Sequence, residues 1–241
     1  MTMTLKCLDI CTGRGSFAKV AKDLGHSVVT LDIDPRCKPD ILADVMHLDY
    51  KSVFQPGEFD FVWCSPPCTT FSCARKCNIG REVNTLAQKG KKCIFTHDTI
   101  QLERETIGVP ILRKCQEIIA YISPKTFIIE NPYTGAMKEY IDYPPAIVDY
   151  CMFGFDYRKR TALWSNKVIK NKICDRSHLQ FGRHKMTAIG NSKTQKGQGG
   201  GESKTGRYAV PRELIHYIFN SVGVTDVVTC EECVDVGASV L

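Results

Sequence analysis

Short apolar runs that alternate with helical segments constrain the fold of this chain more than any other feature. Five of these runs have the composition and length of buried strands. They lie at residues 4–10, 26–34, 40–45, 59–64 and 125–131. Residues 17–24 and 111–122 carry apolar side chains at a helical period, and Pro110 marks the start of the second helix. Strands separated by helices indicate an α/β fold with a doubly wound, mostly parallel sheet, in which ligands bind at the carboxyl ends of the strands.

Polar residues follow the first three predicted strands. The turn after the first strand reads DICTGRGSF and contains Gly13 and Gly15, which let the backbone approach a ligand closely. The second strand ends at Asp32 and Asp34, where a carboxylate can accept hydrogen bonds from both hydroxyls of a ribose. Asp44, after the third strand, could contact an adenine amino group. The alternative for Asp34 and Asp44 is that they are solvent-exposed capping residues. A nucleoside-bearing cofactor is favoured, and NAD is not, because the third glycine of its pattern is missing.

The fourth strand ends in CSPPCTTFS, which places two prolines directly before Cys68. Proline fixes the backbone angle φ, so this turn is suited to holding a thiol in one orientation. A thiolate can add to an electron-poor ring carbon such as C6 of cytosine, if the ring is protonated or hydrogen-bonded at N3. Glu130 ends the fifth strand in the sequence ENP and could face Cys68 across a pocket to supply that proton. A turn with a buried cysteine and an ordinary strand end are the alternatives.

In order and spacing, these motifs resemble those of the DNA (cytosine-5) methyltransferase family. Residues 9–17 resemble its first cofactor motif, residues 67–68 its Pro-Cys nucleophile motif and residues 130–132 its Glu-Asn-Val motif. Residues 153–160 resemble the eighth motif of the family, and residues 207–211 resemble the last one. The Pro-Pro-Cys and Glu-Asn-Pro sequences together are the specific part of the match.

The resemblance implies a Rossmann-like, S-adenosylmethionine-dependent enzyme that methylates C5 of a cytosine flipped out of double-stranded DNA. It implies that Cys68 attacks C6 and that Glu130 stabilises protonated N3. It also implies that Arg158 and Arg160 contact the target base and the neighbouring phosphate. The residues implied to bind the cofactor are Asp9, Cys11, Gly13, Gly15, Asp32, Ile33, Asp44, Val45 and Pro67.

The resemblance also implies a division of the chain. It places a cofactor-binding and catalytic domain at 1–165, a short basic, Gly-rich recognition segment at 166–205, a returning helix at 206–225 and a tail at 226–241. The recognition segment is small for this family, so the chain resembles the compact enzymes of phages and large viruses. A weakly read site or a specificity partner follows as a possibility, and a monomer is expected. Residues 75–92 are basic and follow the nucleophile, where the family has a mobile loop that closes over DNA.

Two other function classes stay open. An RNA cytosine-5 methyltransferase could use the same scaffold, and a DNA-binding homologue could keep the fold without catalysis. The presence of both Cys68 and Glu130 argues against the second, since nothing structural requires that pair. An N4-cytosine methyltransferase is a weaker option, because no aromatic residue follows Pro67. The chain departs from the family pattern at Cys11 and Thr69, where the family has an aromatic residue and a glutamine.

Thirteen cysteines are many for 241 residues, and the N-terminus lacks the pattern of a secretory signal. Most thiols are therefore expected to be reduced, in a cytoplasmic protein or one inside a host cell, with the nucleus also open. No apolar run approaches the roughly 20 residues of a membrane span, so no membrane partner is expected. The net charge of +6 is a weak indication of an anionic partner such as DNA.

Two groups of residues have spacings that could bind zinc. One group is Cys174, His178 and His184, and the other is the pair Cys230 and Cys233. Three ligands and two ligands are each too few for a closed zinc site. The sequence therefore predicts no metal and favours ordinary surface and turn residues.

Overall fold

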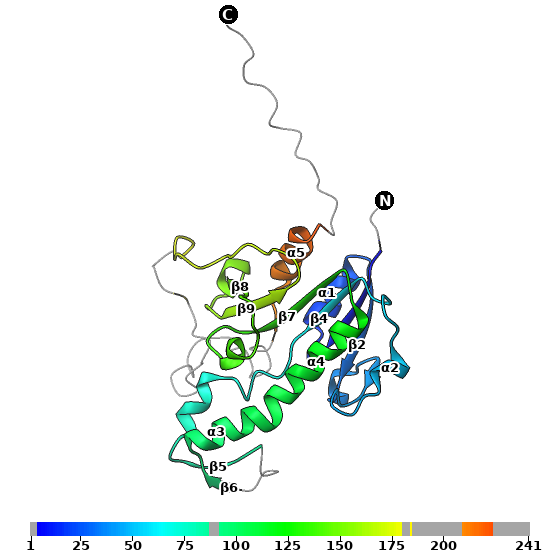
Figure 1. Cartoon of the computed structure of the whole chain (residues 1–241). Coiled ribbons are helices and arrows are strands. Elements are labelled where there is room, and N and C mark those ends of the chain that lie inside the picture. Colours follow the sequence, from blue (N-terminus) through cyan, green and yellow to red (C-terminus); the bar gives the residue numbers. More distant parts are fainter. Residues whose placement is uncertain (1–3, 87–91, 180–183, 185–208, 224–241) are drawn as a thin grey trace, which may run out of the picture.

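A seven-stranded sheet forms the centre of the molecule (Figure 1). The computed structural model describes residues 4–86, 92–179, 184 and 209–223. The strand order is β3-β2-β1-β4-β7-β9-β8. The strands are β1 (Lys6–Ile10), β2 (Ser27–Asp32), β3 (Ile41–Leu42), β4 (Phe61–Cys64), β7 (Thr126–Pro132), β8 (Ala146–Asp149) and β9 (Arg160–Ser165). β9 runs antiparallel to β7 and β8, and the other pairs are parallel, so the predicted doubly wound, mostly parallel sheet is confirmed.

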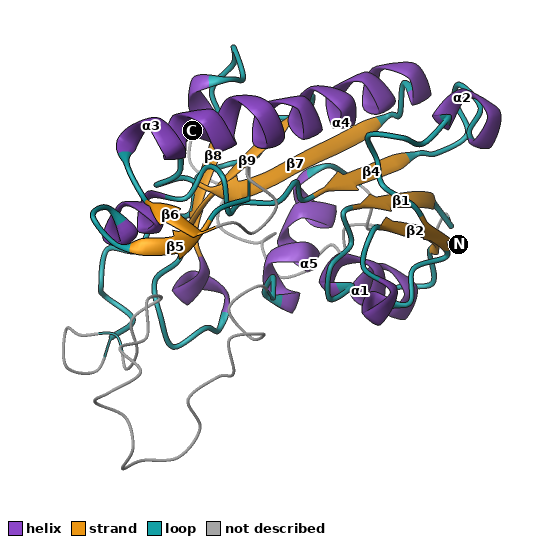
Figure 2. Cartoon of the chain, turned by 90° about the horizontal axis from the view of Figure 1, so that it is seen from below, coloured by secondary structure: helices purple, strands orange, loops and turns teal. Residues whose placement is uncertain are grey.

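Helices cover both faces of the sheet (Figure 2). The helices α1 (Ser16–Asp23) and α5 (Arg212–Ser221) lie on one face, and α4 (Val109–Ile122) lies on the other. The four side chains of β4 are all buried, and they alternate between the two cores. On the α1 and α5 face the rings of Phe17 and Phe219 stack with centroids 5.8 Å apart. A strand that is buried on both faces needs a continuous apolar run, which explains the FVWC sequence.

The segment between β4 and α4 contains elements that the sequence analysis did not predict. The strands β5 (Glu82–Asn84) and β6 (Lys92–Ile94) form a separate antiparallel pair. The helix α3 (His97–Glu103) begins at a capping box of Thr96 and Thr99, and a π-helical turn, η3 (Arg104–Gly108), joins it to α4. The shorter helical elements are α2 (Tyr50–Val53), η1 (Pro35–Cys37), η2 (Cys73–Asn78), η4 (Ala136–Glu139) and η5 (Tyr150–Phe153).

A buried ion pair holds two parts of this segment together, η2 and α3. The guanidinium of Arg75 donates to the carboxylate of Glu103, whose side chain is only 1% exposed. The same carboxylate accepts the backbone N–H of Leu86 at 2.6 Å. The residues after the turn that carries Cys68 are thus anchored on α3, and closure of this segment over DNA stays a prediction.

Several predicted features lie outside the described residues. They include most of the segment predicted at 166–205, the start of the predicted returning helix and the predicted tail, with Cys230 and Cys233. The predicted domain boundaries therefore stay predictions. Among the helices of the described part, none is long and apolar enough to span a membrane.

Candidate active site

The carboxyl ends of β1, β4 and β7 meet at one cavity of about 800 Å³. A volume of this size is typical of sites for small ligands. The turn after β1, the turn after β4, the end of β7 and Val210 before α5 all line it. The lining residues that were predicted as site residues are Asp9, Cys11, Gly13, Pro67, Cys68 and Glu130. The alternating strand pattern thus brings together motifs that are far apart in the sequence.

Hydrogen bonds to the ends of two neighbouring strands fix the turn that carries Cys68. The backbone N–H of Ser65 donates to the carbonyl of Ile10 at the end of β1, at 3.1 Å. The side-chain amide of Asn131 on β7 donates to the carbonyl of Pro66 at 2.8 Å, and this bond is buried. Two prolines and two cross-strand bonds therefore restrict the backbone directly before the thiol. The sequence analysis did not assign this role to Asn131.

Glu130 is 6% exposed and lines the same cavity as Cys68. The hydroxyl of Tyr150, in η5, donates a hydrogen bond to Glu130 Oε1 at 3.1 Å. This bond holds the carboxyl group from the side of β8. A buried carboxyl group beside a half-buried thiol, both facing one cavity, can serve as an acid and a nucleophile toward the same ligand.

Charged neighbours set the reactivity of the Cys68 thiol. Burial raises the pKa of Cys68 above its ordinary value, and the Glu130 carboxylate raises it further, whereas the Lys159 ammonium lowers it. Lys159 lines the cavity and lies over the ring of Tyr150, with Nζ 4.7 Å from the centroid. The fraction of Cys68 that is thiolate therefore depends on burial and on the balance between the Glu130 carboxylate and the Lys159 ammonium. Cys11 also lines the cavity, but a hydrogen bond with Cys115 and burial hold its pKa well above the ordinary value.

The glycine turn after β1 is held in a left-handed conformation. Gly13 and Gly15 have φ angles of 52° and 67°, which side chains with a Cβ atom adopt at a cost. The backbone N–H of Gly13 donates to Asp32 Oδ2 at 2.8 Å, so the acid at the end of β2 supports the turn. Within the turn, the hydroxyl of Thr12 donates to the buried Asp9 carboxylate at 2.5 Å. Burial raises the pKa of Asp9 to about 7, although the Thr12 hydroxyl opposes this shift.

The other predicted cofactor residues do not line the cavity. Asp32 lies behind the glycine turn, and its second oxygen accepts the N–H of Asp34 at 2.8 Å. Ile33 is 63% exposed, whereas Val45 is buried in the core that faces α4. Asp44 accepts the N–H of Met46 within its own turn, at 3.0 Å. A cofactor role for these residues stays a prediction.

The two predicted catalytic arginines also do not line the cavity. Arg160 forms a two-point ion pair with Asp149, at 2.9 and 2.8 Å, and Arg158 is exposed. Lys159 faces the cavity instead. Neighbouring residues of an extended chain point to opposite sides, so Lys159 lies opposite the two arginines. The alternation of the sequence Arg-Lys-Arg was a signal that could have identified Lys159.

No protein-family model matches the chain. A protein of Frog virus 3 (isolate Goorha), described as "Probable DNA (cytosine-5)-methyltransferase", is 43% identical over 165 residues, which are 67% of this chain and 71% of that protein. Among solved structures, an E. coli protein described as "putative DNA modification methyltransferase encoded within prophage" matches with a TM-score of 0.43 and 16% identity. That match covers 67% of this chain and 46% of that chain.

Proposed function

The chain belongs to the DNA (cytosine-5)-methyltransferase family, and we propose that it methylates C5 of cytosine in DNA through a covalent bond between Cys68 and C6. One observation carries this proposal beyond the family. A thiol on a doubly restrained turn and a buried carboxyl group on the neighbouring strand line the same cavity. This is the pair that addition to C6 requires, because the nucleophile and the proton at N3 must act on one ring.

The residues of the cavity fit S-adenosylmethionine, which the family uses. When bound, it supplies a methyl group on a positively charged sulfur. The buried carboxylate of Asp9 suits a cationic group, and Phe17, Trp63 and Val210 offer apolar walls. The left-handed turn at Gly13 lets the backbone approach a ligand without interference from a Cβ atom. Asp9 and the glycine turn are therefore the residues that we expect to hold the cofactor.

The chemistry of the two central residues follows from the cavity. The Cys68 thiolate gives its electron pair to C6, and a bond forms between Sγ and C6. Glu130 holds a proton at N3 while negative charge develops in the ring. After the methyl group is on C5, loss of the C5 proton returns electrons to the ring and breaks the bond to Sγ. The base must leave the stacked duplex, since its C6 face is otherwise out of reach.

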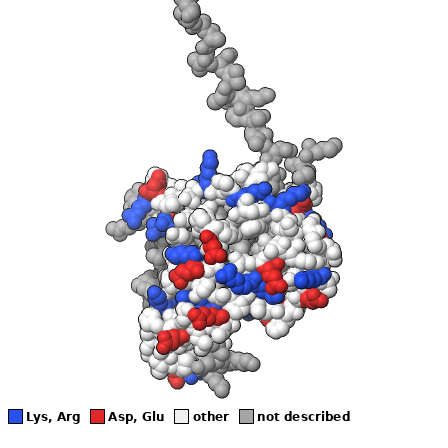
Figure 3. Space-filling model, in the orientation of Figure 1, with Lys and Arg blue, Asp and Glu red and all other residues white. Residues whose placement is uncertain are grey.

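The support for DNA as the substrate comes from the family and the cavity. On the face seen in Figure 3, the Lys and Arg side chains are interspersed with Asp and Glu side chains. The charges on this face therefore do not identify a surface that would bind the phosphates of DNA. Binding to DNA is expected to weaken with salt, because phosphate contacts release counterions.

The test uses duplex DNA that contains 5-fluorocytosine, with S-adenosylmethionine and the full chain. Fluorine at C5 blocks the last elimination, so the protein stays covalently attached and migrates more slowly on a denaturing gel. Cys68→Ser is expected to remove the shifted band. The matched control is Cys73→Ser, which changes an exposed thiol five residues further on and should keep the band.

Two results would contradict the proposal. If the Cys68→Ser protein still gave the shifted band and had the melting temperature of the wild type, Cys68 would not be the nucleophile. If DNA of varied sequence gave no band and 5-fluorocytosine RNA gave one, the substrate would be RNA. A chain that bound S-adenosylmethionine but gave no band on either nucleic acid would be a non-catalytic homologue.

A further inference from the structure

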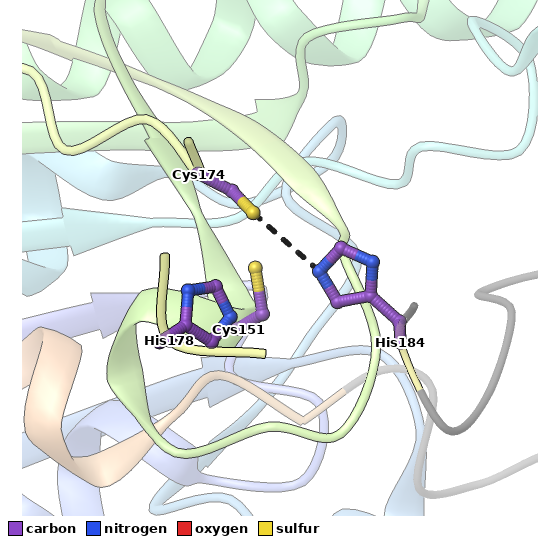
Figure 4. A group of neighbouring side chains, drawn as sticks. All are labelled: Cys151, Cys174, His178 and His184. Atoms are coloured by element: carbon purple, nitrogen blue, oxygen red, sulfur yellow. Dashed lines mark hydrogen bonds between the residues drawn. The ribbon is translucent and has the colours of Figure 1, made fainter. Parts of the chain in front are cut away.

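We propose that Cys151, Cys174, His178 and His184 form a structural zinc site beside β8 (Figure 4). One sulfur or nitrogen atom of each side chain lies within 4.8 Å of the corresponding atoms of the other three. Among the described residues this is the one such group of histidine, cysteine and acidic side chains. The proposal does not depend on the proposed function, because none of the four residues lines the cavity of the candidate active site.

The donor atoms are those that zinc prefers. Two thiolates and two imidazoles make the Cys2His2 set that closes a tetrahedral structural site and leaves no open position for a substrate. Tetrahedral zinc with these bond lengths holds its ligand atoms roughly 3.3–3.8 Å apart. Cys174 Sγ already lies 3.5 Å from His184 Nε2. The other donor atoms lie no more than 4.8 Å apart, so they need to close by at most about 1.5 Å.

The folded chain holds the two cysteines in place. Cys151 lies in η5, directly after β8, and the N–H of Cys174 donates to Asp149 Oδ2 at 2.9 Å. The chain before Cys174 is bonded to β8 as well, since the N–H of Asp149 donates to the carbonyl of Lys172 at 3.0 Å. Arg160 fixes the Asp149 carboxylate from the other side. Fixed backbones on both thiols make a site that is largely formed before the metal binds.

Burial of the four side chains fits a metal site at the surface. Cys151 and Cys174 are 7% and 8% exposed, whereas His184 is half-buried and His178 is exposed. Figure 4 shows the two sulfur atoms between the imidazoles of the histidines. The ring centroids of the histidines lie 5.9 Å apart. The thiols form the floor of the site, and the imidazoles cover it from the solvent side.

Zinc was not favoured from the sequence, because only three ligands are near each other along the chain. The sequence Cys174-x3-His178-x5-His184 lacks a fourth ligand, and Cys151 lies before β9. The sheet supplies this ligand, because the chain returns along β8 after β9. Every cysteine in the described part is a free thiol, so both sulfurs are available to a metal.

Zinc at this position would fasten the chain after β9 to η5. That chain is the start of the segment predicted at 166–205. The metal would fix the position at which this segment leaves the catalytic domain. The segment would then not need a large hydrophobic core of its own. Small structural units often gain their folding free energy from zinc in this way.

The experiment measures zinc in the full chain, purified without chelators, by mass spectrometry of the metal. We expect one zinc per chain in the wild type. Cys151→Ser and Cys174→Ser should each lower this value at least tenfold. Because these thiols are buried, replacing them could disturb folding, whereas His178 is exposed. His178→Ala should therefore fold normally and lower the affinity for zinc at least tenfold, as measured by competition with a chelator. Cobalt(II) in place of zinc should give the visible bands of a tetrahedral site and a thiolate charge-transfer band.

Two controls separate this site from other thiols. Cys73→Ser removes an exposed thiol outside the cluster, and Cys230→Ser with Cys233→Ser removes the pair near the C-terminus. Both proteins should keep one zinc. The proposal is overturned if the wild type takes up neither zinc nor cobalt(II), if Cys151→Ser keeps its zinc, or if the double variant loses it. A disulfide between Cys151 and Cys174 in the protein as purified under reducing conditions would also overturn it.

Discussion

Glu130 and Asp149 are two buried acids at strand ends of one sheet, and their surroundings differ. Glu130 faces the cavity beside Cys68 and accepts a hydrogen bond from Tyr150. Asp149 does not line the cavity of the candidate active site, and its oxygens accept the guanidinium of Arg160 and the N–H of Cys174. An acid whose oxygens are taken up by an arginine and a backbone amide has little capacity left for a ligand. This difference supports the chemical role that we propose for Glu130 and indicates a structural role for Asp149.

The pKa of Asp149 supports this assignment. Burial alone would raise the pKa of this carboxyl group, but the hydrogen bonds from Arg160 and Cys174 outweigh burial and lower it. Asp149 therefore stays charged at neutral pH as the partner of a cation. A group in this state contributes to stability rather than to proton transfer.

Glu130→Gln should have the largest effect on activity. The amide keeps the size of the side chain but cannot hold the proton at N3, so we expect methyl transfer to fall by about 10²–10⁴-fold. The melting temperature should stay close to that of the wild type. Steady-state rates on DNA, with S-adenosylmethionine labelled in the methyl group, measure the loss.

Glu130→Gln should lower methyl transfer but raise the reactivity of the Cys68 thiol. The Glu130 carboxylate raises the pKa of Cys68, so its removal should give more thiolate near neutral pH and faster alkylation by iodoacetamide. Tyr150→Phe is the matched control, because it removes the hydrogen bond to Glu130 and keeps the charge. An equal loss of methyl transfer and of alkylation in Glu130→Gln would mean that the variant had disturbed the whole cavity.

Asp149→Asn should instead lower stability, by about 3 kcal/mol, because it leaves a partly buried Arg160 without its anion. Urea unfolding measures this loss, with the exposed Asp142→Asn as the control. The folded-state pKa of Asp149 is lowered, so its contribution is present above the ordinary carboxyl pKa of about 4 and is lost as the pH falls below it. The variant should lack this part of the acid sensitivity. Stability equal to that of the wild type would show that the ion pair contributes nothing.

The two acids also show which contacts of the structure could be predicted from the sequence and which could not. The fold and the meeting of Cys68 with Glu130 followed from local patterns, because both residues follow parallel strands and such strands end at one edge. Arg160 was assigned to catalysis by its motif. Its partner, Asp149, lies directly opposite on the antiparallel β8, and that register is a tertiary property that no local pattern contains.

The same reason applies to other residues whose surroundings the sequence did not show. Cys151 reaches the Cys174 cluster only because β8 and the chain after β9 lie side by side. Val45, expected at the cofactor, is buried in the core that faces α4, and its cofactor role stays a prediction. The buried ion pair of Arg75 and Glu103 likewise joins residues that are 28 positions apart.

Lys159→Met should have the smallest effect on methyl transfer. It tests whether Lys159 acts on the Cys68 thiol in the site that Cys68 shares with Glu130. The Lys159 ammonium lowers the pKa of Cys68, so its removal should raise that pKa and leave less thiolate at neutral pH. Methyl transfer should fall roughly fivefold at pH 7, and the rising limb of the pH–rate profile should move to higher pH, so that much of the loss is recovered there. Arg158→Met is the control, because Arg158 is exposed and does not line the cavity. If both variants lowered the rate equally at every pH, the positive charge would act on DNA binding rather than on the thiol.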